Sequence, residues 1–70
     1  MMPPMNAVTS SWIAAIGYDD ADEVYVELID GGTYVYEQVP REIWLALATA
    51  QSKGRFVNAV LKPRFACREA

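Results

Sequence analysis

Residues 24–40 read VYVELIDGGTYVYEQVP and predict two β-strands that are joined by a glycine-rich turn and ended by a proline. In residues 24–29, side chains alternate with the period of two that is typical of a strand with one buried face. In residues 33–39, Tyr34 and Tyr36 are two positions apart and therefore lie on the same face of their strand. These features predict a β-hairpin at the centre of the domain.

The length of the hairpin loop decides what the two tyrosines face. A two-residue loop would place them beside Tyr25 and Glu27. A three-residue loop, Asp30-Gly31-Gly32, would pair them with Leu28 and Val26. We expect the three-residue loop, because glycine suits its left-handed position and because the tyrosines then join the apolar face. Both tyrosines are therefore expected to be core residues.

Residues 9–18, TSSWIAAIGY, predict a strand before the hairpin, because they are rich in β-branched and aromatic side chains. Ile13 and Ile16 are three positions apart and cannot share a face of an unbroken strand. We therefore expect either a bulge near Ala14 and Ala15 or a late start of the strand. The acidic residues that follow are expected to form a solvated turn, since they lack the ligand spacing of a calcium-binding loop.

The second half of the chain predicts two helices. Pro40 ends the hairpin because proline donates no ladder hydrogen bond, and it also suits the first turn of a helix. Residues 41–51 are rich in helix formers, with apolar side chains at spacings of three and four. Ser52 suits the N-cap of a second short helix, which we expect Pro63 to stop. We therefore predict an α+β domain in the order β-β-β-α-α, with a three-stranded antiparallel sheet packed by two short C-terminal helices.

The 70-residue length predicts a single domain, because so short a chain cannot bury two cores. We expect residues 1–8 to form a flexible arm or an edge extension, residues 9–65 the domain, and residues 66–70 a C-terminal tail. No stretch approaches the roughly 20 apolar residues of a membrane span, and no signal-peptide pattern is present. Cys67 is the single cysteine and has no partner for an internal disulfide. We therefore expect a cytoplasmic protein that does not enter a membrane.

A set of motif residues stands in order along the chain: Ser10-Ser11, Ile13, Ile16-Gly17-Tyr18, Gly32, Tyr34-Val35-Tyr36, Val39-Pro40, Ala50, Ser52, Gly54, Phe56, Asn58, Leu61 and Lys62. This set resembles the KTSC domain, a family named after a C-terminal extension of some lysyl-tRNA synthetases and also found as free-standing small bacterial proteins. The likeness extends from about Val8 to Phe65, with departures at Val57, where the family more often has an aromatic residue, and at Pro63.

The resemblance implies a stand-alone domain, for which RNA binding has been suggested mainly through the synthetase connection, and it implies no catalytic residues. We interpret seven of the motif residues as structural: Tyr34, Tyr36, Pro40, Ser52, Gly54, Phe56 and Asn58.

Enzymatic activity is the function class that the residues support least. The chain contains no histidine, and its serines have no evident activating partner. No glycine-rich segment matches the spacing of a phosphate-binding loop. We therefore expect no catalytic residue, no cofactor and no metal site.

Charge is divided between the two halves of the chain. Residues 1–40 carry seven acidic and no basic residues, whereas residues 41–70 carry six basic and two acidic residues. Lys53, Arg55, Lys62 and Arg64 flank the second predicted helix and are the candidate contacts for RNA or for a partner. The sequence pI of 4.6 lies far below the value of roughly 9 that is typical of nucleic-acid-binding domains. RNA binding is therefore expected to be weak and sensitive to salt.

A protein-interaction role is the other candidate function. Four apolar or aromatic residues are expected to lie partly outside the core and to suit a protein contact: Trp12, Tyr25, Val35 and Leu45. We therefore expect a small non-catalytic binding domain that docks on a larger assembly or self-associates as a homodimer. The alternative is a weak RNA-binding domain that uses the basic second helix. We expect no small-molecule cofactor for either role.

Overall fold

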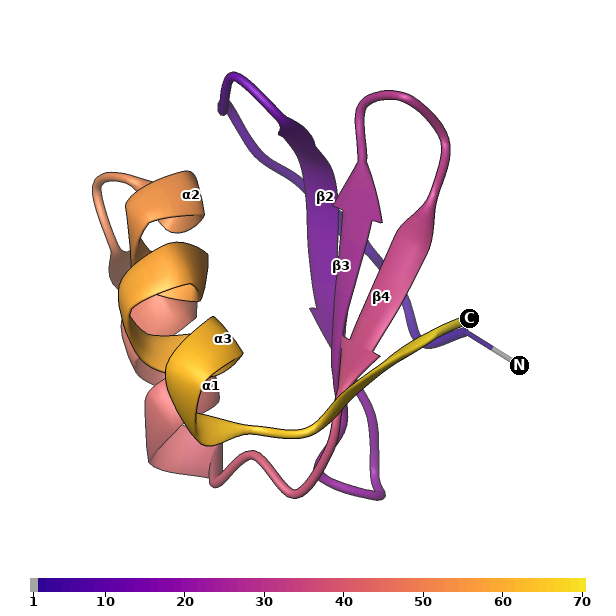
Figure 1. Ribbon diagram of the computed structural model, residues 1–70, viewed down its shortest axis with the longest axis vertical. Coiled ribbons are helices and arrows are strands. Elements are labelled where there is room, and N and C mark those ends of the chain that lie inside the picture. The colour runs from indigo at the N-terminus through magenta and orange to yellow at the C-terminus, as the bar shows by residue number, and fades with distance from the viewer. Residues whose placement is uncertain (1) are drawn as a thin grey trace.

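The computed structural model describes residues 2–70 and shows an antiparallel β-sheet with its helices on one face (Figure 1). The described residues form five strands in the spatial order β1-β2-β3-β4-β5. The strands are β1 (Asn6–Ala7), β2 (Ile13–Tyr18), β3 (Val24–Leu28), β4 (Thr33–Tyr36) and β5 (Cys67–Glu69). The helical segments are α1 (Arg41–Thr49), α2 (Lys53–Phe56), the π-helical turn η1 (Val57–Leu61) and α3 (Lys62–Arg64).

The prediction of a three-stranded sheet is wrong, because β1 and β5 extend the sheet at its two edges. β1 lies within the predicted arm and pairs with β2, so the edge-extension alternative describes it. β5 lies within the predicted tail and pairs with β4. Both edge strands are short and exposed, so they show no alternation that sequence periodicity could detect. The α+β class is confirmed, with the order β-β-β-β-α-α-β over residues 2–70.

The two alternatives expected for the strand before the hairpin both occur. β2 begins late, at Ile13, and its pairing with β3 shifts register between Ile13 and Ala15. Ala14 is the extra residue of this bulge. The bulge brings Ile13 and Ile16 into the same core, where they are 0% and 2% exposed.

The β3–β4 hairpin keeps the predicted face but not the predicted pairing. Val26 lies opposite Tyr34, and the three-residue loop consists of Ile29–Gly31 instead of residues 30–32. Gly31 has φ of 106°, which is the left-handed conformation expected of a glycine in this loop. A register shift of two residues preserves the alternation of side chains, so both tyrosines still face the apolar side.

The first helix begins and ends near its predicted limits. Pro40 precedes α1, and its carbonyl accepts hydrogen bonds from the backbone N–H groups of Ile43 at 2.9 Å and Trp44 at 3.2 Å. Ser52 caps the second helix as predicted, since its hydroxyl accepts a hydrogen bond from the N–H of Arg55 at 3.3 Å.

The second helix extends past Pro63, where we expected it to stop. The segments α2, η1 and α3 follow one another without a break, and they end at Arg64. Within them, the N–H of Lys62 donates to the carbonyl of Val57, five residues earlier. Proline has no N–H and crowds the carbonyl four residues before it, so an α-helical bond is not available at Pro63. The π-type bond beside it keeps the backbone helical up to the proline.

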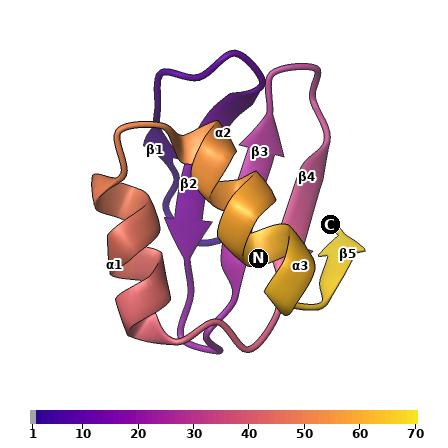
Figure 2. The same cartoon turned by 60° about the vertical axis from the view of Figure 1, so that its left-hand side comes forward.

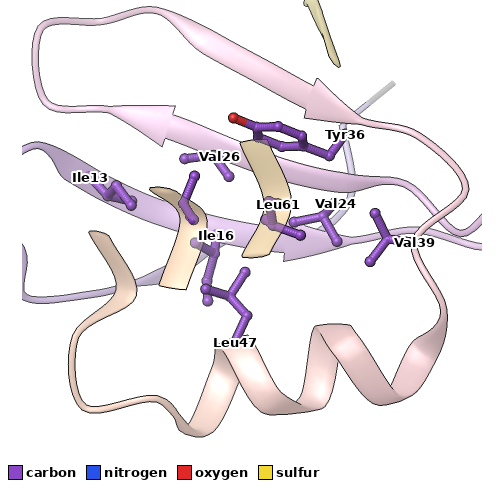
Figure 3. Packing of buried hydrophobic residues seen from close by; sticks show 9 residues of the cluster. Ile13, Ile16, Val24, Val26, Tyr36, Val39, Leu47 and Leu61 are labelled. Carbon is purple, nitrogen blue, oxygen red and sulfur yellow. The ribbon is translucent and has the colours of Figure 1, made fainter. Parts of the chain in front are cut away.

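The core lies between the sheet and the two helices, which lie side by side across the same face (Figure 2). Leu47 from α1 and Leu61 from the second helix meet residues of β2, β3 and β4 in this layer (Figure 3). Nine side chains form the buried cluster: Ile13, Ile16, Val24, Val26, Tyr36, Val39, Leu47, Val57 and Leu61. Among residues 2–70, no helix has the length and apolar composition needed to cross a membrane.

The face of the sheet away from the helices is partly covered by the N-terminal residues. A Cβ atom on Gly17 would lie 2.6 Å from the sulfur of Met5 and 3.0 Å from the carbonyl oxygen of Pro4, so these residues pack directly on β2. Tyr25 and Val35 lie in line with Gly17 across the sheet and are 8% and 1% exposed. The expectation that these two side chains lie partly outside is therefore wrong, because both are buried on this partly covered face.

The packing of α1 yields a first prediction. Leu47→Ala should lower the free energy of unfolding by about 2–5 kcal/mol, because it leaves a cavity in the core. Leu45→Ala is the matched control in the same helix and should change it by less than about 0.5 kcal/mol. Leu47 is 0% exposed and Leu45 is 51% exposed. Urea unfolding followed by circular dichroism measures both, and equal losses would contradict the packing described above.

The contact between the N-terminal residues and β2 yields a second prediction. Gly17→Ala should cost about 1–3 kcal/mol of unfolding free energy, because the added methyl group overlaps Met5. In a chain shortened to remove residues 2–5, the same substitution should cost less than about 0.5 kcal/mol. Thermal unfolding of the four proteins tests this cycle. A cost that is the same in both backgrounds would show that the N-terminal residues do not cover Gly17 in solution.

Candidate binding cleft

A cleft of about 400 Å³ opens on the helix side of the sheet, between the second helix and strands β3 to β5. Its floor is formed by side chains of β3 and β4 that share one face because of the alternation described above. The rest of its lining comes from the segment before β2, from α3 and from β5. The lining residues are Trp12, Val26, Leu28, Tyr34, Tyr36, Lys62 and Cys67. We call this site the aromatic cleft.

Trp12 forms one wall of the aromatic cleft and is held there by local and long-range contacts. The hydroxyl of Ser10 accepts hydrogen bonds from the N–H groups of Trp12 at 3.3 Å and Ile13 at 3.2 Å, which fixes the turn that leads into β2. The indole packs against Gly54 of α2 so closely that a Cβ atom there would overlap its ring nitrogen. Glycine is therefore required at this position for the helix to approach the ring. Trp12 was expected to lie partly outside the core, and it is half-buried against the core cluster.

Lys62 lies at the rim of the aromatic cleft. Its ammonium nitrogen is 5.5 Å from the centroid of the Trp12 ring, within the range of a cation–π interaction. Among the described residues that line the cleft, Lys62 is the one with a formal charge at neutral pH. The cleft therefore combines aromatic walls with a single positive charge at its opening.

Tyr36 and Cys67 face each other across β4 and β5 at the other wall. Burial is the main cause that raises the pKa of Tyr36 to about 12, and the neighbouring thiol of Cys67 adds to the effect. The phenol is therefore protonated at neutral pH and can donate a hydrogen bond.

Arg68 clamps β5 to the rest of the sheet and so keeps the Cys67 wall in place. Its guanidinium lies 2.7 Å from a carboxylate oxygen of Glu37 and 2.9 Å from one of Glu23. A second nitrogen donates to the other oxygen of Glu23 at 3.1 Å, so that pair is bidentate. These hydrogen bonds raise the pKa of Arg68 above its usual value. The side chains of residues 67 and 68 point to opposite faces of the sheet, so the clamp stays outside the cleft.

The structure does not bring the four predicted basic contacts together. Lys62 lines the aromatic cleft, whereas the ammonium group of Lys53 donates a hydrogen bond to the carbonyl of Ala50 at the end of α1. Arg55 borders a polar hollow of about 330 Å³ near the start of the second helix, and Lys53 lines the same hollow. Arg64 is exposed in the last helical turn. Two of the four predicted basic contacts, Lys53 and Arg55, therefore share one hollow, whereas Lys62 and Arg64 lie elsewhere.

The remaining predicted site residues also lie in different parts of the structure. Leu45 is exposed on α1, as expected, and is absent from the described lining of the aromatic cleft. Phe56 packs against the core cluster, and Asn58 borders the polar hollow near Ser52. Among residues 2–70, no three histidine, cysteine, aspartate or glutamate side chains are close enough to hold a metal ion.

Sequence reasoning missed the aromatic cleft although it identified its floor. It assigned both tyrosines to the core, and both do face the helix side of the sheet. Tyr36 is buried there, whereas Tyr34 is only half-buried. The cleft exists because the second helix does not cover this part of the sheet, which no local pattern reveals. The sequence feature that comes nearest to indicating the cleft is Trp12, because its large side chain requires a glycine on the helix that it faces.

The wall formed by Trp12 yields a third prediction. Gly54→Ala adds a good helix former, which alone would stabilise the helix by about 1 kcal/mol. We nevertheless expect a net loss of stability, because the new methyl group overlaps the indole of Trp12. In a Trp12→Ala background the same change should become neutral or stabilising. Chemical unfolding of the four proteins measures this coupling, and an equal effect in both backgrounds would rule out the contact.

Comparisons with known proteins identify the relatives of this domain. The model of the KTSC domain matches residues 9–65. A protein of Tsukamurella paurometabola is 48% identical over 62 residues, which cover 87% of this chain and 92% of that protein. An uncharacterized protein of Stutzerimonas stutzeri is 42% identical over 59 residues, which cover 83% of each chain.

A solved structure has the same fold. The crystal structure of a KTSC domain protein from Yersinia pestis superimposes with a TM-score of 0.90, at 38% sequence identity and with 96% of each chain covered. The family match and this structure agree, and the chain belongs to the KTSC domain family.

Proposed function

We propose that this domain is a non-catalytic protein-interaction module, and that the aromatic cleft receives an apolar side chain of a partner protein. The observation that carries the proposal is a preformed cleft of about 400 Å³ with three aromatic rings in its lining. Small binding pockets in proteins have roughly 300–1,000 Å³ and are lined mainly by apolar and aromatic groups. Tyrosine and tryptophan are also enriched among the residues that dominate protein interfaces.

The energetics of the cleft favour occupation by an apolar group. Tyr34 and Leu28 are half-buried, so part of their apolar surface remains in contact with water. Covering apolar surface contributes about 25 cal/mol for each Å² removed from water. The rings are held by the sheet and by the Trp12–Gly54 contact, so little side-chain entropy is lost when a partner binds.

RNA binding is the second candidate function, and one observation favours it. The Lys62 ammonium group over the Trp12 ring places a cation beside an aromatic surface, a combination that single-stranded nucleic-acid binders use. Two basic side chains are less available, because Arg68 is paired with carboxylates and Lys53 is bonded to a carbonyl. The net charge of −3 also opposes the approach of RNA. We therefore rank protein binding first.

Affinity capture from a nuclease-treated lysate tests the proposed function. Immobilised wild-type domain should retain a specific protein, and Tyr34→Ala should reduce the retained amount at least about tenfold, because it removes part of the cleft floor. Glu42→Gln is the control and should retain the protein fully, since Glu42 is exposed on α1 and absent from the described lining of the cleft. Circular dichroism verifies that both variants are folded. Retention that is unaffected by Tyr34→Ala, or that is seen only from an untreated lysate, would contradict the proposal.

A further inference from the structure

We infer that the aromatic cleft binds a partner segment in which an aromatic side chain adjoins an acidic residue. The aromatic side chain occupies the space between Trp12 and the two tyrosines, and the carboxylate pairs with Lys62. This inference rests on the proposed function, and it adds the chemistry of the group that is recognised.

Lys62 is free to accept a carboxylate from a partner. The ion pairs formed within residues 2–70 involve Arg68, and none of them includes Lys62. The ammonium group is instead positioned over the Trp12 ring, 5.5 Å from its centroid. A carboxylate that approaches from the solvent side can pair with this cation while the ring stays on the other side. An ion pair beside an apolar surface is also less screened than one in bulk water.

The position of charge at the cleft determines the orientation of the bound partner segment. Glu69 is opposite Tyr34 in the β4–β5 pairing, but it is absent from the described lining of the aromatic cleft and lines a hollow with Tyr25 and Val35 instead. A partner carboxylate is attracted to the end formed by Trp12 and Lys62, because the one formal charge of the described lining is located there. The acidic residue of the partner therefore lies toward α3, and its aromatic neighbour lies over the tyrosines.

The size of the cleft limits how much of the partner it holds. A volume of about 400 Å³ lies near the lower end of the range for small binding pockets. One aromatic side chain with its acidic neighbour suits this volume, whereas a longer peptide would extend beyond the lining residues. Recognition by the cleft is therefore expected to be weak for one segment and to depend on a short motif.

Titration of the ¹⁵N-labelled domain with capped tetrapeptides tests the inference, with the indole N–H signal of Trp12 as the local probe. The first peptide is acetyl-Gly-Phe-Asp-Gly-amide. In the second, Asn replaces Asp, and in the third, Ala replaces Phe. The Phe-Asp peptide should bind about tenfold more tightly than the Phe-Asn peptide, and the Ala-Asp peptide should not shift the Trp12 signal. Raising the salt concentration should reduce this preference.

Two matched variants assign the preference to one residue. Lys62→Gln should remove the tenfold difference between the Phe-Asp and Phe-Asn peptides. Arg64→Gln removes an exposed charge of the same helix and should leave the difference unchanged.

If both Phe peptides bind equally to the wild-type domain, the carboxylate specificity is wrong and the proposed apolar docking stands. If no Phe peptide shifts the Trp12 signal, both ideas fail. A larger Lys62-dependent shift with a single-stranded RNA oligonucleotide would overturn the inference in favour of RNA.

Discussion

The pairing of Val26 with Tyr34 is the interaction on which the rest of the structure depends. Because strand side chains alternate, this register places the apolar residues of β3 and both tyrosines on one side and Tyr25 and Val35 on the other. Both faces of the hairpin then carry large apolar side chains, and these side chains need to be covered. The helices cover one face, and the N-terminal residues cover part of the other, so the sheet is the middle layer of a small domain (Figure 1).

The elements that sequence periodicity predicted are those long enough to show a period. Strands β2, β3 and β4 and both helices contain enough residues to show an alternation or a helical stripe. β1 has two residues and β5 has three, and their stability comes from neighbours that are distant in sequence. The backbone of Glu37 donates to Ala66, and that of Ala70 donates to Thr33, which ties β5 to β4. Backbone bonds of this kind leave no pattern in the side chains.

The hairpin loop and the cleft illustrate two limits of local reasoning. Two registers that differ by two residues place the same side chains on the same face, so alternation predicted the orientation of the tyrosines but not their partners. Whether a face is then covered depends on where a helix from another part of the chain lies. The contact between Trp12 and Gly54 determines this position, and it joins residues whose sequence neighbourhoods show no relation. The core assignment of Tyr36 was therefore predictable, and the opening beside Tyr34 was not.

In the folded domain, the acidic and basic halves of the chain do not form two separate charged surfaces. Arg68 of the basic half is paired with Glu23 and Glu37 of the acidic half, on the face of the sheet away from the helices. A sheet and its packed layer are about 10 Å thick, which is close to one Debye length at physiological salt. Acidic groups on the far face are therefore largely screened from the cleft, whose charge is set locally by Lys62. An acidic domain can in this way carry a cleft with a positive charge at its rim.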